Sequence, residues 1–368
     1  MQQIPIQNHQ TRKYYPGITL YKLVGCLLVV FTHIGLPQIY TQLNKSIIGL
    51  HSFVAVVVPC FYIISGFLAY QGWSNAKHPH LYVRRYIMWI TSVYLIFFIF
   101  YLLDNVVPLF VHYGFVPHLI LKQSIILLDI LFVTGPNAAL WFVPPLIFGT
   151  ISCYYLYTTK KLALASKLAL TGFLLTLCMF GTLRILIESI FGPISFLSNT
   201  YVNIAMAIIY KYVGFGFTFV FAGTLLGKYD NKFLQLNAWT LTLLTSVVVM
   251  LEIILLNYIA VGYHSYYFVF SMMPLSILAF YGILHVKLNG VLTYHKFINA
   301  FTILTFFCHV YFIDINMRIL GYKLHHTTIR QTALCLLLTL MEGLIFTSLV
   351  LYAQRSFKIP IKKLLSFN

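Results

Sequence analysis

Two ionisable residues in the first apolar segment have types and a spacing suited to proton transfer. The stretch "KLVGCLLVVFTH", residues 22–33, begins with Lys22, ends with His33 and contains no other Lys, Arg, His, Asp or Glu. In an α-helix this spacing turns through about 1100°, so both side chains share one face, roughly 16 Å apart along the axis. An imidazole accepts protons near neutral pH, and an ammonium attracts anions. The spacing therefore predicts a path with a cation at one end and a base deeper in the helix.

Each of these residues also has a purely structural explanation. A lysine near the end of a membrane helix snorkels to the lipid headgroups, and a histidine inside the membrane hydrogen-bonds a neighbouring helix. Ionisable side chains are costly in hydrocarbon, so two on one face of an apolar helix are candidates for function. Three acids in apolar segments are candidates to orient His33 or to pair with Arg184 or Lys211: Glu188, Glu252 and Glu342.

The composition places these residues in a membrane protein. Hydrophobic residues make up 60% of the 368 and charged residues only 8%, far below the share of about 25% in soluble domains. Apolar segments of about 20 residues, the length that crosses the hydrocarbon core, occupy nearly the whole chain. We expect an all-α, polytopic helix bundle in a single domain over 1–368, with spans near 18–36, 48–70, 86–107, 139–157, 168–190, 203–226, 237–260, 266–285, 297–316 and 331–353.

An eleventh apolar segment, 119–134, is short for a span. It contains Lys122 and Asp129 and is better suited to a re-entrant or interfacial helix. If it does not cross, sixteen of the 24 lysines and arginines fall on the side of the termini, five on the opposite side and three within helices. The positive-inside rule therefore favours ten spans in a multi-pass cell-membrane protein with both termini cytoplasmic. The long first span lacks a cleavage site and is expected to be retained.

Several classes of function have no support in the sequence. The basic residues are scattered at loop edges and form no stripe for nucleic acid. No GxxxxGK[ST], GxGxxG or HExxH motif is found, which argues against ATP-driven pumping, dinucleotide chemistry and zinc hydrolysis. No metal site or disulfide framework is expected, because the six cysteines lie in apolar stretches without a CxxC pair. The histidine pairs at 78 and 80 and at 325 and 326 have no third ligand at metal-binding spacing.

Six stretches of the chain, taken in order, match patterns of one known family. They are "YPGITLYKLVGCLLVVFTHIGLP", "VPCFYIISGFLAY", "RRYIMWI", "ALWFVPPLIF", "FGFTFVFAGTLLGKY" and "FTILTFFCHVYFID". They are spread over most of the chain, from residue 15 to residue 314, and in this order they resemble the acyltransferase 3 family of integral-membrane O-acyltransferases. In that family a basic residue of the first helix is followed after ten residues by an essential histidine. The second stretch is similar to the family's "plFFvlSGfl" pattern, through Pro59, Phe61, Ser65, Gly66 and Phe67, and the last stretch resembles the family's late "sfgiYLiH" helix.

The resemblance implies an enzyme that moves an acyl group, acetyl or succinyl, from a cytoplasmic acyl-coenzyme A to a hydroxyl of a cell-surface or exported carbohydrate. His33 is then a catalytic residue, either as general base or as transient acyl acceptor, and the sequence leaves both routes open. Lys22 is the catalytic donor-side cation, and Arg84 and Arg85 are expected to bind donor phosphates with it. Acyl-coenzyme A is a substrate, and no permanently bound cofactor is expected.

Three further residues are candidates for lining the site, each weighed against a packing role: Ser65, Trp141 and His309. The expected partners are the lipid bilayer, the carbohydrate acceptor and other polysaccharide-assembly proteins. A transporter or flippase for a polysaccharide or lipid-linked sugar would use buried ionisable residues equally well. A non-catalytic partner in surface-polymer assembly is a further alternative. The in-phase Lys22 and His33 favour acyl transfer over both.

The chain departs from the family pattern at several positions. Lys22 stands where the family has arginine, and Thr19 stands where it has aspartate. Met88 and Trp89 lie where a proline is usual. Lysine keeps the charge but loses the planar fork that grips phosphate or carboxylate, so the identity of the donor is left open. The departures indicate a divergent branch, similar to the intercellular adhesin C-type proteins of biofilm-polysaccharide modification.

Overall fold

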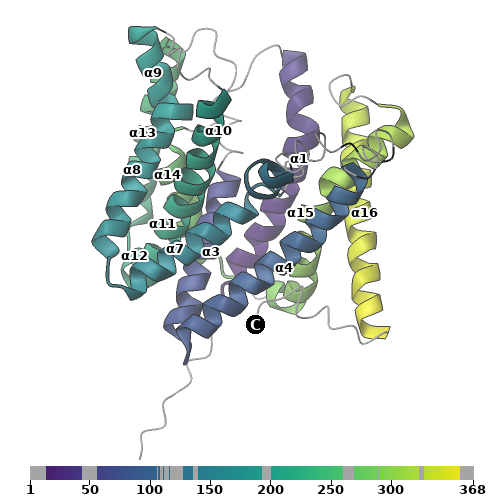
Figure 1. Ribbon diagram of the computed structural model, residues 1–368, viewed down its shortest axis with the longest axis horizontal. Helices are drawn as coiled ribbons and strands as arrows, with labels where there is room; N and C mark the ends of the chain where they lie inside the picture. The colour runs from purple at the N-terminus through teal and green to yellow at the C-terminus, as the bar shows by residue number, and fades with distance from the viewer. Residues whose placement is uncertain are drawn as a thin grey trace, which may run out of the picture.

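The all-helical fold expected from the composition is confirmed. The computed structural model describes residues 14–43, 56–105, 127–135, 140–192, 200–259, 269–288, 290–322 and 327–356, with positions 107, 111 and 116. Every regular element in these ranges is a helix (Figure 1). They are α1 (Pro16–Leu43), α3 (Val57–Ser74), α4 (Pro79–Asn105), η1 (Ile130–Thr134), α7 (Val143–Thr158), α8 (Leu162–Phe180), α9 (Thr182–Phe191), α10 (Thr200–Ile208), η3 (Ile209–Phe217), α11 (Thr218–Lys228), α12 (Asp230–Leu234), α13 (Ala238–Ile259), α14 (Met272–His285), α15 (Gly290–Leu320) and α16 (Ile329–Ser356).

Prolines and glycines mark several helix boundaries. Pro16 and Pro79 are the first residues of α1 and α4, where a missing amide hydrogen does no harm because no helical carbonyl precedes it. Gly192 and Gly321 follow α9 and α15 with φ of 80° and 66°. This left-handed conformation terminates helices and is adopted by glycine without steric strain.

Seven of the described helical segments are long and apolar enough to cross a membrane. They are Pro16–Gly35, Pro79–Phe100, Leu162–Phe180, Val202–Lys228, Ala238–Tyr258, Gly290–Leu320 and Ile329–Ser356. The other three predicted spans, 48–70, 139–157 and 266–285, overlap the shorter helices α3, α7 and α14. The polytopic bundle is therefore confirmed, and the total of ten spans stays a prediction.

The short apolar segment 119–134 is described only in its second half. Residues 119–126 lie outside the described residues, and 127–134 are helical, ending in the π-helical turns of η1. The prediction that this segment does not cross the membrane is therefore untested.

Helix α3 lies at the centre of the bundle and touches α11 backbone to backbone. A Cβ atom at Gly66 would overlap the carbonyl oxygen of Val220, and one at Gly223 would overlap that of Ile63. Small residues allow such close approach, which gains dispersion energy where no hydrophobic effect drives helices together. The "SGF" of α3 and the "AGT" of α11 are therefore two halves of one helix contact.

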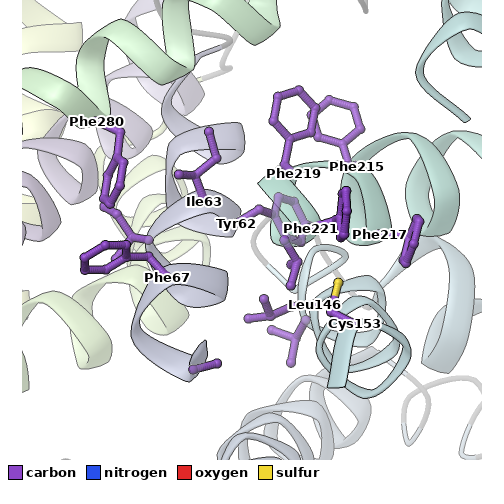
Figure 2. Packing of buried hydrophobic residues seen from close by; sticks show 14 of the residues in the cluster. Tyr62, Ile63, Phe67, Leu146, Cys153, Phe215, Phe217, Phe219, Phe221 and Phe280 are labelled. Atoms are coloured by element: carbon purple, nitrogen blue, oxygen red, sulfur yellow. The ribbon is translucent and has the colours of Figure 1, made fainter. Parts of the chain in front are cut away.

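Aromatic side chains fill the spaces on either side of α3 (Figure 2). On one side, Tyr62 lies among the phenylalanines of η3 and α11, with its ring 6.2 Å from that of Phe215. On the other side, Phe67 meets Phe280 of α14 at 5.1 Å. The many aromatic residues in this region are therefore core residues.

The ends of many helices gather at one face of the bundle, here called the basic face. The contacts that join them are Tyr70 Oη with Tyr157 Oη at 3.3 Å, Gln71 Nε2 with Asp230 Oδ2 at 3.2 Å, Tyr281 Oη with the carbonyl of Leu236 at 2.7 Å, and the rings of Tyr14 and His295 at 5.8 Å. The lysines and arginines next to these ends include Lys77, Arg84, Arg85, Lys160, Lys161, Lys228, Lys232, Lys287 and Lys296. The alternation of the helices that the charge pattern predicts and the cytoplasmic assignment of this face both stay predictions.

Candidate functional site

The two histidines singled out in the sequence meet between α1 and α15. The ring centres of His33 and His309 are 5.1 Å apart, with an angle of 38° between the ring planes. Nearer the basic face, Lys22 Nζ donates a hydrogen bond to Asn299 Oδ1 at 3.5 Å. The two helices run in parallel, because both begin beside the Tyr14–His295 contact (Figure 1). The Lys22–Asn299 contact, here called the Lys22 level, and the His33–His309 contact, here called the histidine level, thus follow one another along the same pair of helices.

His309 is fully buried and its two ring nitrogens have different surroundings. Nδ1 lies 2.7 Å from the carbonyl oxygen of Phe306, within its own helix. Nε2 is buried, and no hydrogen-bond partner for it is found among the described residues. His33 is half-buried. The pair therefore combines one imidazole fixed by its backbone with one that is partly accessible.

Aromatic rings line the stretch between the Lys22 level and the histidines. Tyr21 contacts Phe61 of α3 at 5.5 Å, and Phe61 contacts Phe306 of α15 at 6.0 Å. Phe306 in turn meets Phe142, just before α7, at 5.1 Å and His309 at 5.9 Å. These side chains form what we call the aromatic wall. Phe61, Phe306 and Phe142 are only half-buried although they lie between four helices.

Gly25 makes room for the aromatic wall on α1. A Cβ atom at this position would lie 2.8 Å from a ring carbon of Phe61, closer than carbon atoms pack. Because Gly25 lies between Lys22 and His33 in the helix, the ring enters the bundle between the two functional levels. An apolar lining of this kind suits a substrate segment without charge.

Trp141 connects the aromatic wall to a second half-buried cation. It precedes Phe142 directly, packs against Phe215 at 5.7 Å and lies under Lys211 Nζ at 5.4 Å from the ring centre. Such a cation–π contact is worth about 0.5–2 kcal/mol, depending on how far it is desolvated. Trp141 is therefore one residue from the site, with Lys211 on its far side.

Lys211 lies in η3, a π-helix of nine residues that sequence reasoning did not predict. Wide π-helical turns occur often at functional sites. The amine of Lys211 donates to the carbonyl of Val133 at 2.6 Å. The only signal in the sequence was the lysine itself, which is unusual in an apolar segment.

Three side chains hold the end of η1. Tyr94 Oη donates to the carbonyl of Leu131 at 2.6 Å, Tyr212 Oη to that of Phe132, and Lys211 to that of Val133. A helix leaves its last four carbonyls without intrahelical donors, and side chains of α4 and η3 supply three here. The segment that ends at Thr134 is therefore anchored beside Trp141.

The remaining predicted site residues lie nearer the basic face. Ser65 is half-buried on α3 and lies between the contacts that Phe61 makes with Tyr21 and Phe67 makes with Tyr15. It is thus below the histidines, and no hydrogen bond joins it to either of them among the described residues. Arg84 and Arg85 are exposed in the second turn of α4. The structure therefore brings His33 and His309 together and links them through Phe306 to Phe142, the neighbour of Trp141, while Lys22, Arg84 and Arg85 lie nearer the basic face.

The acids in the membrane segments have other partners than His33. Glu188 pairs with Arg184 at 3.0 Å, as one of the sequence alternatives proposed. Glu342 accepts a hydrogen bond from Asn316 at 2.8 Å. Glu252 accepts hydrogen bonds from Thr182 and from the amide groups of Phe270 and Ser271 at the start of α14. Glu252 and Glu342 therefore connect helices and Glu188 pairs within α9, while the ionisable neighbour of His33 among the described residues is a histidine.

Comparison with known proteins supports the arrangement at the level of the family. A family model described as an acyltransferase domain matches residues 15–352, which run from the first turn of α1 to the last turns of α16. Neither curated proteins nor solved structures gave a match. The match includes both helices that hold the two histidines.

Proposed function

Because the chain belongs to the acyltransferase 3 family, we propose that it is a membrane O-acyltransferase. In this proposal it moves an acetyl or succinyl group from a cytoplasmic acyl-coenzyme A to a hydroxyl of a cell-surface or exported carbohydrate. The observation that supports this function is the position of His33. It lies beside His309, at the deep end of an aromatic wall whose other end is next to Lys22.

The reaction needs one base and one acid, and His33 serves as both in turn. Its free ring nitrogen takes the proton of the acceptor hydroxyl while the oxygen attacks the thioester carbonyl. The carbon–sulfur bond then breaks, and the imidazolium returns the proton to the departing thiolate. A histidine suits this cycle because its ordinary pKa of about 6.5 lies close to the working pH.

The donor fits the basic face and the apolar lining. Coenzyme A carries phosphate groups at one end and the thioester at the other, joined by an arm without charge. Lys22 lies roughly 16 Å from His33 along α1, and the exposed Arg84 and Arg85 add positive charge at the same face. Opposite charge raises the local concentration of an anionic substrate and speeds its association.

Ester analysis of the surface polysaccharide tests the proposal. O-acyl groups are measured by mass spectrometry of released glycan from cells with the wild type, His33→Ala or no gene, at matched membrane levels. We expect the esters to vanish in the last two while polymer export continues. His295→Ala is a matched control, because it removes a histidine from α15 at the basic face, outside the aromatic wall. Esters that persist in His33→Ala, or a loss of export alone, would point to transport.

A further inference from the structure

The buried Nε2 atom of His309 has no explanation in the packing of its own helix. Native structures leave few buried polar atoms without a partner, and each exception calls for a cause. The nitrogen belongs to a fully buried ring, and among the described residues nothing donates to it or accepts from it. The nearest aromatic neighbours recorded are His33 at 5.1 Å and Phe306 at 5.9 Å. His33 alone of these two has an N–H group to offer.

The other nitrogen fixes the tautomer of His309. A backbone carbonyl oxygen can only accept a hydrogen bond, so the 2.7 Å contact with Phe306 requires a proton on Nδ1. In the neutral ring, Nε2 is then a bare acceptor. A hydrogen bond made by one ring nitrogen thus determines the role of the other, as it does in histidines held by a second residue.

The spacing of the rings suits a hydrogen bond between them. Donor and acceptor nitrogens about 2.9 Å apart put the centres of two imidazoles roughly 5 Å apart when the rings meet edge to edge. The observed separation is 5.1 Å. The torsion that turns a histidine ring has a broad minimum, so His33 can direct one nitrogen at His309 by rotation of its own side chain.

We propose that His309 is the positioning residue of His33. Its bare Nε2 accepts the N–H group of His33, holds His33 in one tautomer and leaves the opposite nitrogen free as the base. The inference rests on the proposed function for the identity of the reaction. It assigns to His309 no contact with the substrate.

The proton balance requires no further group. When His33 takes the hydroxyl proton it has an N–H on both nitrogens, and one of them still points at His309. That hydrogen bond becomes charge-assisted and therefore stronger as the imidazolium forms. When the thiolate leaves, the proton goes back along the substrate side and His33 recovers its first tautomer. His309 stays neutral throughout.

In the part of the chain that the structure describes, the other ionisable groups near this level are engaged elsewhere. On α15 itself Asp314 pairs with Arg318 at 2.6 Å, and on α16 Glu342 accepts from Asn316 at 2.8 Å. From α3 and from the start of α7 the described contacts to this part of α15 are phenylalanine rings, and α4 adds Phe97 against Phe307. Lys22, on α1, lies roughly three turns away. His309 is therefore the ionisable group placed to orient His33.

Nitrogen NMR of histidine-labelled protein in lipid nanodiscs tests the tautomer directly. The full chain is used, and the His33 signals are assigned by their loss in His33→Ala. We expect one tautomer of His33 in the wild type and a mixture in His309→Leu, which fills the space without an acceptor. His309→Gln places an amide oxygen where Nε2 was, and we expect it to restore the single tautomer.

Kinetics give a second readout on the same variants. For His309→Leu we expect kcat to fall about 10- to 100-fold, as for other residues that orient a functional histidine, with KM for donor and acceptor unchanged. His309→Gln should recover most of the rate. A mixed tautomer in the wild type, an unchanged tautomer and rate in His309→Leu, or no recovery in His309→Gln would each overturn the proposal. The NMR result needs neither donor nor acceptor, so it stands or fails separately from the proposed function.

Discussion

Lys22 of α1 donates a hydrogen bond to Asn299 of α15, and the same two helices bring His33 to His309 farther along. The cation and the candidate base therefore face one neighbour. A lysine that only reached for lipid headgroups would not need an amide partner on the helix that holds the second histidine. The contact instead directs the ammonium along the inside of the bundle.

Replacement of Lys22 should affect the donor and leave the acceptor alone. A hydrogen bond to a charged group contributes about 1.5–3 kcal/mol, so we expect Lys22→Ala to raise KM for acyl-coenzyme A by about 10- to 100-fold. Lys22→Arg keeps the charge and should keep most donor binding. Initial rates at varied donor and acceptor concentrations measure both constants. A loss in Lys22→Arg as large as that in Lys22→Ala would contradict a donor-side charge.

Removal of the His33 imidazole should stop transfer without unfolding the protein. General base catalysis contributes about 10²- to 10⁴-fold, so we expect His33→Ala to lose at least that factor in kcat. The melting temperature and membrane level should match the wild type. Incubation with radiolabelled acyl-coenzyme A and no acceptor separates the two routes, since a base leaves the protein unlabelled. Stable label that disappears in His33→Ala would show an acyl-histidine instead.

Loss of the Lys211 amine should destabilise the end of η1. Lys211→Met leaves the half-buried Val133 carbonyl without its donor, and a hydrogen bond to a charged group contributes about 1.5–3 kcal/mol. We expect a lower melting temperature in detergent and easier proteolysis after Thr134. Lys167→Met is the control, because Lys167 is exposed on α8. Equal melting temperatures for the two variants would show that this contact does not anchor η1.

Two glycines with opposite surroundings test the central helix contact. A methyl group at Gly223 would overlap the backbone of α3, whereas nothing lies within 4 Å of one at Gly282 of α14. Overpacking costs about 1–3 kcal/mol, so Gly223→Ala should accumulate poorly in membranes. Gly282→Ala should reach wild-type levels. Immunoblots of membrane fractions and melting curves measure the difference, and a well-folded Gly223→Ala would argue against the tight α3–α11 contact.

The sequence predicts which residues share one face of a helix better than it predicts which residues of other helices that face contacts. Hydropathy and helical period place Lys22 and His33 on one face of α1, and the structure puts both against α15. Nothing in the period of α1 could identify Asn299 as the partner, because that contact depends on tertiary packing. His309 was singled out through the family resemblance, since a buried histidine alone looks like any satisfied core residue.

The π-helical segments lay beyond sequence reasoning for a different reason. The residues of η3 are aromatic or β-branched, with two glycines and one lysine. Glycine is also frequent in membrane α-helices, and a wider turn differs from an α-helix by a single extra residue in each hydrogen-bonded ring. The wider turns of η3 occur together with tertiary contacts: Gly216 lies against the backbone of Pro145, and Lys211 reaches the end of η1. No local pattern reports such contacts.

Helices α1 and α15 run in parallel and touch at two levels, Lys22–Asn299 and His33–His309. Both contacts can form together only if each helix keeps its number of residues between these levels. One residue inserted between Lys22 and His33 would rotate the imidazole by about 100° and lift it by about 1.5 Å. An inserted leucine would leave hydropathy and membrane insertion as they are, yet it would separate His33 from His309. Substitutions are thus tolerated here more readily than insertions or deletions, because the two helices together fix the distance between the cation and the imidazole pair.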